Sequence, residues 1–168
     1  MMTLHAGYLQ TNLSLSINPA IAATLPPGAD ISMNDEKINL WTVGGKLDWH
    51  NVVGYTEYMK ANMASNLPNT SAWYATVGYR MSNWLPHVTF AKITSAENVP
   101  LSQDQQSVTL GLRHELTTSS ALKFEVKHIR TLHDTFGLYQ PDVDSETGQP
   151  HFDKSNANIY SIAYDVVF

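Results

Sequence analysis

Apolar and polar residues alternate along most of the chain, in runs of about 9–13 residues that are separated by residues favouring turns. Such alternation places successive side chains on opposite faces of an extended strand. The best helix signal is Asn18 followed by Pro19, in residues 17–25, which is typical of a helix start. We predict eight β-strands, at residues 3–15, 37–48, 52–62, 70–81, 85–94, 105–116, 120–131 and 156–168.

The connections between these runs alternate in length. The sequences DWHN, SNW and TTSS follow the second, fourth and sixth runs, whereas the other four connections are longer. In an up-and-down antiparallel sheet every second connection lies at the same end. One end of the predicted sheet therefore has only tight turns and the other has all the long loops, an asymmetry that is typical of bacterial outer-membrane barrels.

The two faces of the predicted strands differ in polarity. In residues 105–116, Leu110 and Leu112 point one way while Gly111 and Arg113 point the other. A soluble barrel buries its apolar face, whereas a membrane barrel turns that face toward lipid, and periodicity fits both. Aromatic residues favour the membrane barrel, because their rings prefer the membrane interface and several lie near the ends of runs. These residues are Trp41, Trp49, Trp73, Tyr79, Trp84 and Phe168.

Three segments resemble parts of Gram-negative bacterial outer-membrane porins: WYATVGYRMSNWLPHVTFAK, SVTLGLRHELTTSSALKFEVKHI and the terminal YSIAYDVVF. The resemblance implies an all-β, antiparallel, up-and-down transmembrane β-barrel. About eight strands are present, which is half of a porin barrel of about 16–18 strands. It also implies a non-enzymatic role, the passive diffusion of small hydrophilic solutes or ions through the bacterial outer membrane. The implied partners are outer-membrane lipid and, for the full-length protein, two further copies in a homotrimer.

The last strand carries alternating large residues. In porins a C-terminal Phe preceded by such residues is the recognition signal for the outer-membrane assembly machinery, and the matching residues here are Tyr160, Ile162, Tyr164, Val166 and Phe168. The start of the chain shows no signal peptide. We therefore expect a C-terminal fragment that begins at an internal Met, with residues 1–168 forming one barrel segment and 132–155 a long extracellular loop. The alternatives are a complete eight-stranded outer-membrane barrel with a structural or adhesion role, and a soluble ligand-binding β-barrel.

The polar face supplies the candidate pore lining. It carries five cations and five carboxylates, so it predicts neither anion nor cation selectivity. For any one of these residues, a cross-strand ion pair that braces the wall is the more usual role. Among them we expect Arg113, Lys123 and Lys127 to contact solute. The pore-lining candidates are Glu57, Arg80, Arg113, Lys123, Glu125, Lys127 and Asp165.

Composition argues against several other classes of function. The chain has no cysteine, a net charge of −5 and a pI of about 5.7, which disfavour thiol chemistry and a nucleic-acid surface. It has no zinc-protease or nucleophile-elbow motif, and we predict no cofactor. The acidic residues of segment 132–155 resemble a calcium-binding loop only weakly, because Thr147 stands where an EF-hand loop needs glycine. We therefore expect a solvated acidic loop. The acidic residues concerned are Asp142, Asp144, Glu146 and Asp153.

Overall fold

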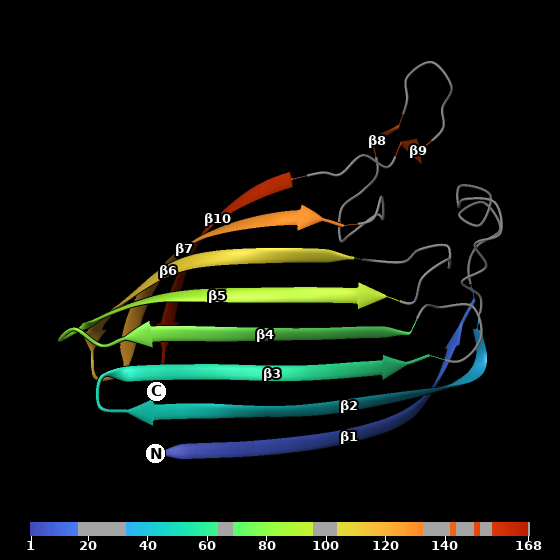
Figure 1. The fold of residues 1–168 in the computed structure, drawn as a ribbon, viewed down its shortest axis with the longest axis horizontal. Coiled ribbons are helices and arrows are strands. Elements are labelled where there is room, and N and C mark those ends of the chain that lie inside the picture. Colours follow the sequence, from blue (N-terminus) through green and yellow to red (C-terminus); the bar gives the residue numbers. More distant parts are fainter. Residues whose placement is uncertain are drawn as a thin grey trace.

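The computed structural model contains the eight predicted strands, joined into one antiparallel sheet in the order β1-β2-β3-β4-β5-β6-β7-β10 (Figure 1). It describes residues 1–16, 33–63, 69–95, 104–132, 142–143, 150–151 and 156–167. The predicted fold class, all-β with up-and-down antiparallel strands, is confirmed. The strands are β1 (Met2–Leu15), β2 (Met33–Trp49), β3 (Val52–Asn62), β4 (Thr70–Tyr79), β5 (Trp84–Ser95), β6 (Gln105–Thr117), β7 (Ser120–Thr131) and β10 (Asn156–Val166).

Two further strands lie within the segment 132–155, which the sequence predicted to be a loop. These are β8 (Asp142–Val143) and β9 (Pro150–His151), which pair with each other and not with the large sheet. The helix signal at residues 17–25 lies outside the described residues. Among the described residues, no helix is long and apolar enough to cross a membrane.

The three short connections, after β2, β4 and β6, reverse the chain at one end of the sheet (Figure 1). We call this the turn side, and the opposite end the loop side. In two of these turns a residue other than glycine adopts the left-handed conformation, His50 with φ of 53° and Ser82 with φ of 54°. A positive φ at a turn matches the right-handed twist of the strands on either side, which keeps the hairpins tight.

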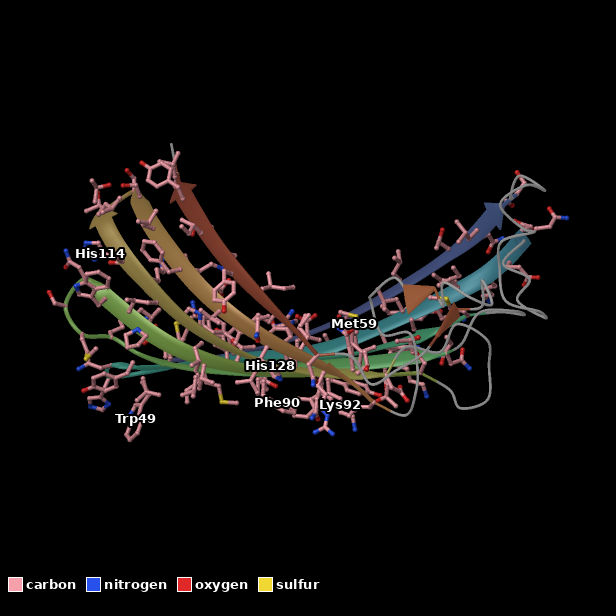
Figure 2. The ribbon with its side chains drawn as sticks, turned by 90° about the horizontal axis from the view of Figure 1, so that it is seen from above. Trp49, Met59, Phe90, Lys92, His114 and His128 are labelled. Atoms are coloured by element: carbon pink, nitrogen blue, oxygen red, sulfur yellow. The ribbon has the colours of Figure 1, made fainter. Side chains whose placement is uncertain are left out.

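The sheet is curved, and its two faces differ (Figure 2). The labelled Trp49, Phe90 and Lys92 lie on the convex side, and Met59 lies on the concave side. From these residues, the pairing register assigns each remaining strand residue to the convex or the concave face. One convex residue from each strand, in chain order, is Leu4, Val43, Tyr58, Trp73, Phe90, Leu110, Val126 and Ile162. One concave residue from each strand is His5, Lys46, Glu57, Tyr74, His87, Arg113, Glu125 and Asp165.

Burial follows the curvature. Side chains on the concave side converge and shield one another, so Val53, Ala121 and Ile129 are at most 5% exposed although no second layer of described strands covers them. Convex side chains splay apart, and large apolar residues such as Leu110 and Ile162 stay more than 60% exposed. The apolar face is thus the exposed outer face of the curved sheet.

The sheet has two free edges. Strands β1 and β10 lie at its opposite edges, and the sheet order contains no pairing between them. The described strands therefore form an open curved wall and not a closed barrel.

Candidate functional site

Register positions place six of the seven pore-lining candidates on the concave face, and Arg80, just beyond β4, joins them through its contact with Asp48. They fall into separate clusters rather than one ring. Most of the charged groups lie toward the turn side, and hydroxyl and apolar residues dominate the loop side, for example Ser107, Thr109, Ile129 and Thr131.

The first cluster joins Asp48 at the end of β2 to Arg80, just beyond β4. The guanidinium donates two hydrogen bonds to the carboxylate, Nη1 to Oδ1 at 2.8 Å and Nη2 to Oδ2 at 2.7 Å. These bonds raise the pKa of the Arg80 guanidinium above its ordinary value. The pair reaches across β3, where Val53 lies between Asp48 and Gly78 in the register.

The second cluster connects β6, β7 and β10. Arg113 Nη1 donates a hydrogen bond to Asp165 Oδ2 at 2.7 Å, and this contact crosses β7. On β7 itself, Lys123 Nζ lies 3.3 Å from Glu125 Oε2. Arg113 and Lys123 are also direct partners in the register, so their charges would repel without the two carboxylates.

His87 on β5 extends this cluster. Its Nε2 lies 3.3 Å from Glu125 Oε1, and its Nδ1 lies 3.3 Å from the carbonyl oxygen of Leu85. Both ring nitrogens face acceptor oxygens, so the protonated ring can donate to both. The ring lies over Gly111, where an added Cβ would come within 2.2 Å of Nε2. A glycine at this position therefore makes room for the histidine.

The remaining candidates have weaker partners. The Tyr74 hydroxyl donates to Glu57 Oε2 at 3.4 Å. Lys127 forms no ion pair with any described residue, whereas the cations Arg80, Arg113 and Lys123 each have a carboxylate partner. Of the three residues expected to contact solute, Lys127 is thus the one whose charge the described residues leave uncompensated.

This arrangement of interleaved charges can attract and orient small polar solutes. Positive and negative groups are interleaved, so the described wall has no dominant sign. Among the described residues, no three His, Asp or Glu side chains are placed to hold a metal ion together. The calcium pattern lies outside the residues whose side chains are described.

Sequence reasoning missed His87 as part of the site. The contact to Glu125 depends on how β5, β6 and β7 are aligned, which no single run of residues reveals. One signal was available: His87 alternates in phase with Thr89, which puts it on the polar face. The cavity over Gly111 had no sequence signal of its own.

The predicted assembly signal occupies the convex face. Tyr160, Ile162, Tyr164 and Val166 are 49–75% exposed there, along the free edge strand β10. Phe168 lies outside the described residues. The structure therefore shows a row of exposed large side chains on an edge strand that pairs with β7 on one side only.

Aromatic residues form an oblique line across the loop-side half of the convex face. Tyr8 lies opposite Trp41, and Tyr58 lies opposite Trp73 two residues further toward the turn side. Phe90 is displaced by two residues more. On β6 and β7 valines continue the line. We call the whole set the aromatic line, and its members from β1 to β10 are Tyr8, Trp41, Tyr58, Trp73, Phe90, Val108, Val126 and Tyr160.

A polar line runs parallel to the aromatic line, two residues further toward the loop side on every strand. Its members are Gln10, Asn39, Lys60, Ser71, Lys92, Gln106, His128 and Asn158. Both lines move by two residues for every two strands. With a rise of about 3.3 Å per residue and about 4.8 Å between strands, each line makes an angle of about 35° with the direction perpendicular to the strands.

The turn-side end of the convex face has aromatic groups of its own. Trp49, Tyr79 and Trp84 are each at least 40% exposed, and Trp84 stacks on His114 with 3.9 Å between ring centroids. On β2, Trp41 and Trp49 are separated by about 26 Å along the strand, or about 22 Å once the oblique angle is included. An apolar band of that height separates the two aromatic zones.

Comparison with known proteins adds no assignment, since no protein-family profile, no curated protein and no solved structure matches this chain.

Proposed function

We propose that this chain is a wall segment of an outer-membrane porin, which lets small hydrophilic solutes or ions diffuse passively across the bacterial outer membrane. The observation that carries the proposal is the sense of the curvature. The apolar face is convex and exposed, and the ion-paired face is concave. A barrel that continues this curvature would present apolar side chains outward and charges to its lumen, which is the arrangement of membrane barrels.

The aromatic line supports the same proposal. Rings of Trp and Tyr prefer the membrane–water interface, and a membrane surface is flat, so interfacial residues on tilted strands must fall on an oblique line. The angle of about 35° matches strand tilts in outer-membrane barrels, and the apolar band of about 22 Å approaches their usual height of about 25 Å. The polar line lies directly beyond the aromatic line, on its loop side, as expected where the chain leaves the membrane interface for water.

The alternatives fit these observations less well. A soluble ligand-binding barrel needs an apolar interior, and here the concave face carries Arg113, Asp165 and the His87–Glu125 contact. A complete eight-stranded barrel needs β1 to pair with β10, and the sheet order lacks that pair. An open edge is costly in lipid, so the proposed pore requires further strands on both edges, and in vesicles that contain this chain alone a second copy would have to supply them.

In the proposed pore, solutes would pass along the concave wall. The paired cations would brace neighbouring strands, and Lys127 would present its charge to the solute. Homotrimer formation and recognition of β10 by the assembly machinery follow from the porin resemblance, and they belong to this proposal.

The proposal can be tested by asking which face touches lipid. Two variants of the full chain would each retain a single tryptophan, with the other tryptophans changed to Phe. One keeps Trp73 on the convex face, and the other carries Met59→Trp on the concave face. After refolding into phosphatidylcholine vesicles, brominated acyl chains should quench Trp73 strongly. Aqueous acrylamide should quench the tryptophan at position 59 in preference.

The two reporters control for each other, because they sit on adjacent strands. Equal quenching of both by brominated lipid, or of neither, would contradict the proposal. Strong quenching at position 59 alone would invert the two faces. A chain that folds without vesicles or detergent, and that brominated lipid does not quench, would favour the soluble barrel.

A further inference from the structure

The cations of the two faces differ in how they are compensated. On the concave face three of the five described cations, Arg80, Arg113 and Lys123, lie 2.7–3.3 Å from carboxylate oxygens. On the convex face from β3 to β10, the described Lys and Arg side chains form no ion pair with a described residue. They are Lys60 on β3, Lys92 on β5 and Arg130 on β7.

All three convex cations lie on the loop side of the aromatic line, and none lies within the apolar band. Lys60 and Lys92 belong to the polar line itself, and Arg130 follows His128 by two residues. One step of two residues is about 6.6 Å along a strand, or about 5 Å in depth once the strand tilt is included. In the proposed membrane orientation, these charges stand at the level of the lipid headgroups.

Lys92 and Arg130 are close enough to act on one headgroup, and Lys60 continues the same row. Lys92 pairs with Gln106, and Gln106 pairs with Arg130, so the two cations are separated by two strand spacings, about 10 Å between backbones. Lys60 lies two strands beyond Lys92 and two residues closer to the loops. Side chains of this length can span the gaps, and the Gln106 amide lies between two of them.

Aromatic rings form the floor beneath this group. Trp73 pairs directly with Lys92, and its ring lies 5.3 Å from that of Phe90 by centroids. A cationic row above an aromatic floor matches a molecule with an anionic head and apolar chains. Neither a free anion nor a soluble partner would use both parts.

No described carboxylate lies within ion-pair distance of the three cations. Asp104, which directly precedes β6, is only 5% exposed. Its Oδ1 accepts a hydrogen bond from the backbone N–H of Ser95 at 2.7 Å. Asp35 lies at the far corner of the sheet, where Asn12 and Ser14 bind it. His128 is engaged with Asn158 Oδ1 at 2.8 Å.

We propose that Lys60, Lys92 and Arg130 form a binding site for the phosphate groups of a membrane lipid, in the leaflet on the loop side. Gln106 contributes a hydrogen-bond donor, and Trp73 and Phe90 contact the acyl chains. This inference rests on the proposed membrane location. It adds a specific lipid to the wall's surroundings, whereas the porin proposal requires only that lipid be present.

The test uses the full chain with Trp73 as its single tryptophan, refolded into phosphatidylcholine vesicles that contain phosphatidic acid as the phosphate-monoester lipid. The bromine label is placed either on phosphatidic acid or on phosphatidylcholine. The ratio of Trp73 quenching by the two labelled lipids gives the preference of the site for phosphatidic acid. Each cation near an anionic lipid surface contributes about a fivefold preference. The triple variant K60Q/K92Q/R130Q should therefore lose a preference of up to about 100-fold.

The matched control is K46Q/K123Q/K127Q, which removes the same charge from the concave face and should keep the lipid preference. An unchanged preference in the convex triple variant would overturn the site, as would a loss of equal size in the control. Displacement by dilute inorganic phosphate would show a free-anion site instead and would also overturn it. If brominated phosphatidylcholine itself leaves Trp73 unquenched, the porin proposal fails, which is a different result from a lost headgroup preference.

Discussion

The two faces of this sheet are built from the same strands, yet they treat their charged and apolar groups in opposite ways. On the concave face the ionic groups gather into pairs, such as Arg113 with Asp165. On the convex face apolar side chains stand exposed, and cations occur only beyond the aromatic line. Alternation alone produces two unlike faces, and curvature then decides which of them is the outside. The comparison yields predictions that differ by face, at neighbouring positions of one strand.

The largest difference is expected for a charge placed in the middle of each face of β4. Val77 is convex and 52% exposed, and Thr76 is its concave neighbour. In lipid vesicles, Val77→Arg should lower the free energy of unfolding by about 2–4 kcal/mol, because the new charge meets hydrocarbon. Thr76→Arg should cost much less, because its side chain enters a wet lumen. Urea unfolding followed by tryptophan fluorescence measures both.

The order of these two effects is the decisive result. If Thr76→Arg proves the more damaging variant, the concave face is the dry one and the assignment of the faces is wrong. Loss of the Thr76–Thr89 hydroxyl contact, which is 2.7 Å, belongs to the expected cost of that variant.

An intermediate difference is expected at the adjacent glycines of β2. An added Cβ at Gly44, on the concave face, would lie 2.7 Å from the backbone oxygen of Thr56 and 2.6 Å from the His5 ring. At Gly45, on the convex face, the nearest atom is the flexible end of Leu4 at 3.1 Å. Gly44→Ala should therefore destabilise the sheet by about 1–3 kcal/mol, as overpacking does.

Gly45→Ala serves as the control, and its effect should stay within about 0.5 kcal/mol of zero. The same urea titration measures both variants. Equal costs for the two substitutions would mean that the concave side is not the more crowded face.

The predicted strands were largely right because alternation is a local property of the sequence. The eight runs appear in the structure with ends shifted by a few residues. The largest shift is at β2, which begins at Met33, four residues before its predicted start. The segment MNDE has no alternation to reveal it, and it pairs with β1 through a register shift near Asp35, whose φ is 55°.

The candidate site was predictable only in part. Side-chain parity placed Arg113, Lys123 and Asp165 on one face without knowledge of the fold. Which carboxylate meets which cation depends on contacts that cross a whole strand, such as Arg113 to Asp165 over β7. The sense of the curvature also belongs to the sheet as a whole, so no single run of residues predicts it.

The smallest effect is expected for the exposed ion pair itself. Arg113 and Asp165 side chains are 34% and 50% exposed, so solvent screens their attraction. A double-mutant cycle with Arg113→Gln and Asp165→Asn should give a coupling of about 0.5 kcal/mol that weakens with salt. A coupling several times larger would show that the concave face is drier than we infer.

The oblique lines of the convex face also constrain how the open wall can be completed. Each strand is offset by about one residue from the last, so a full circuit accumulates an offset, or shear, roughly equal to the number of strands. The two edge strands, β1 and β10, run in opposite directions, because seven antiparallel pairings separate them. Only an even number of added strands can then restore antiparallel pairing at both edges. With eight strands added at the same tilt, the barrel radius would be about 15 Å, wide enough for an aqueous passage. For a given number of strands, the tilt of the strands in this sheet thus determines the radius of any pore that it helps to enclose.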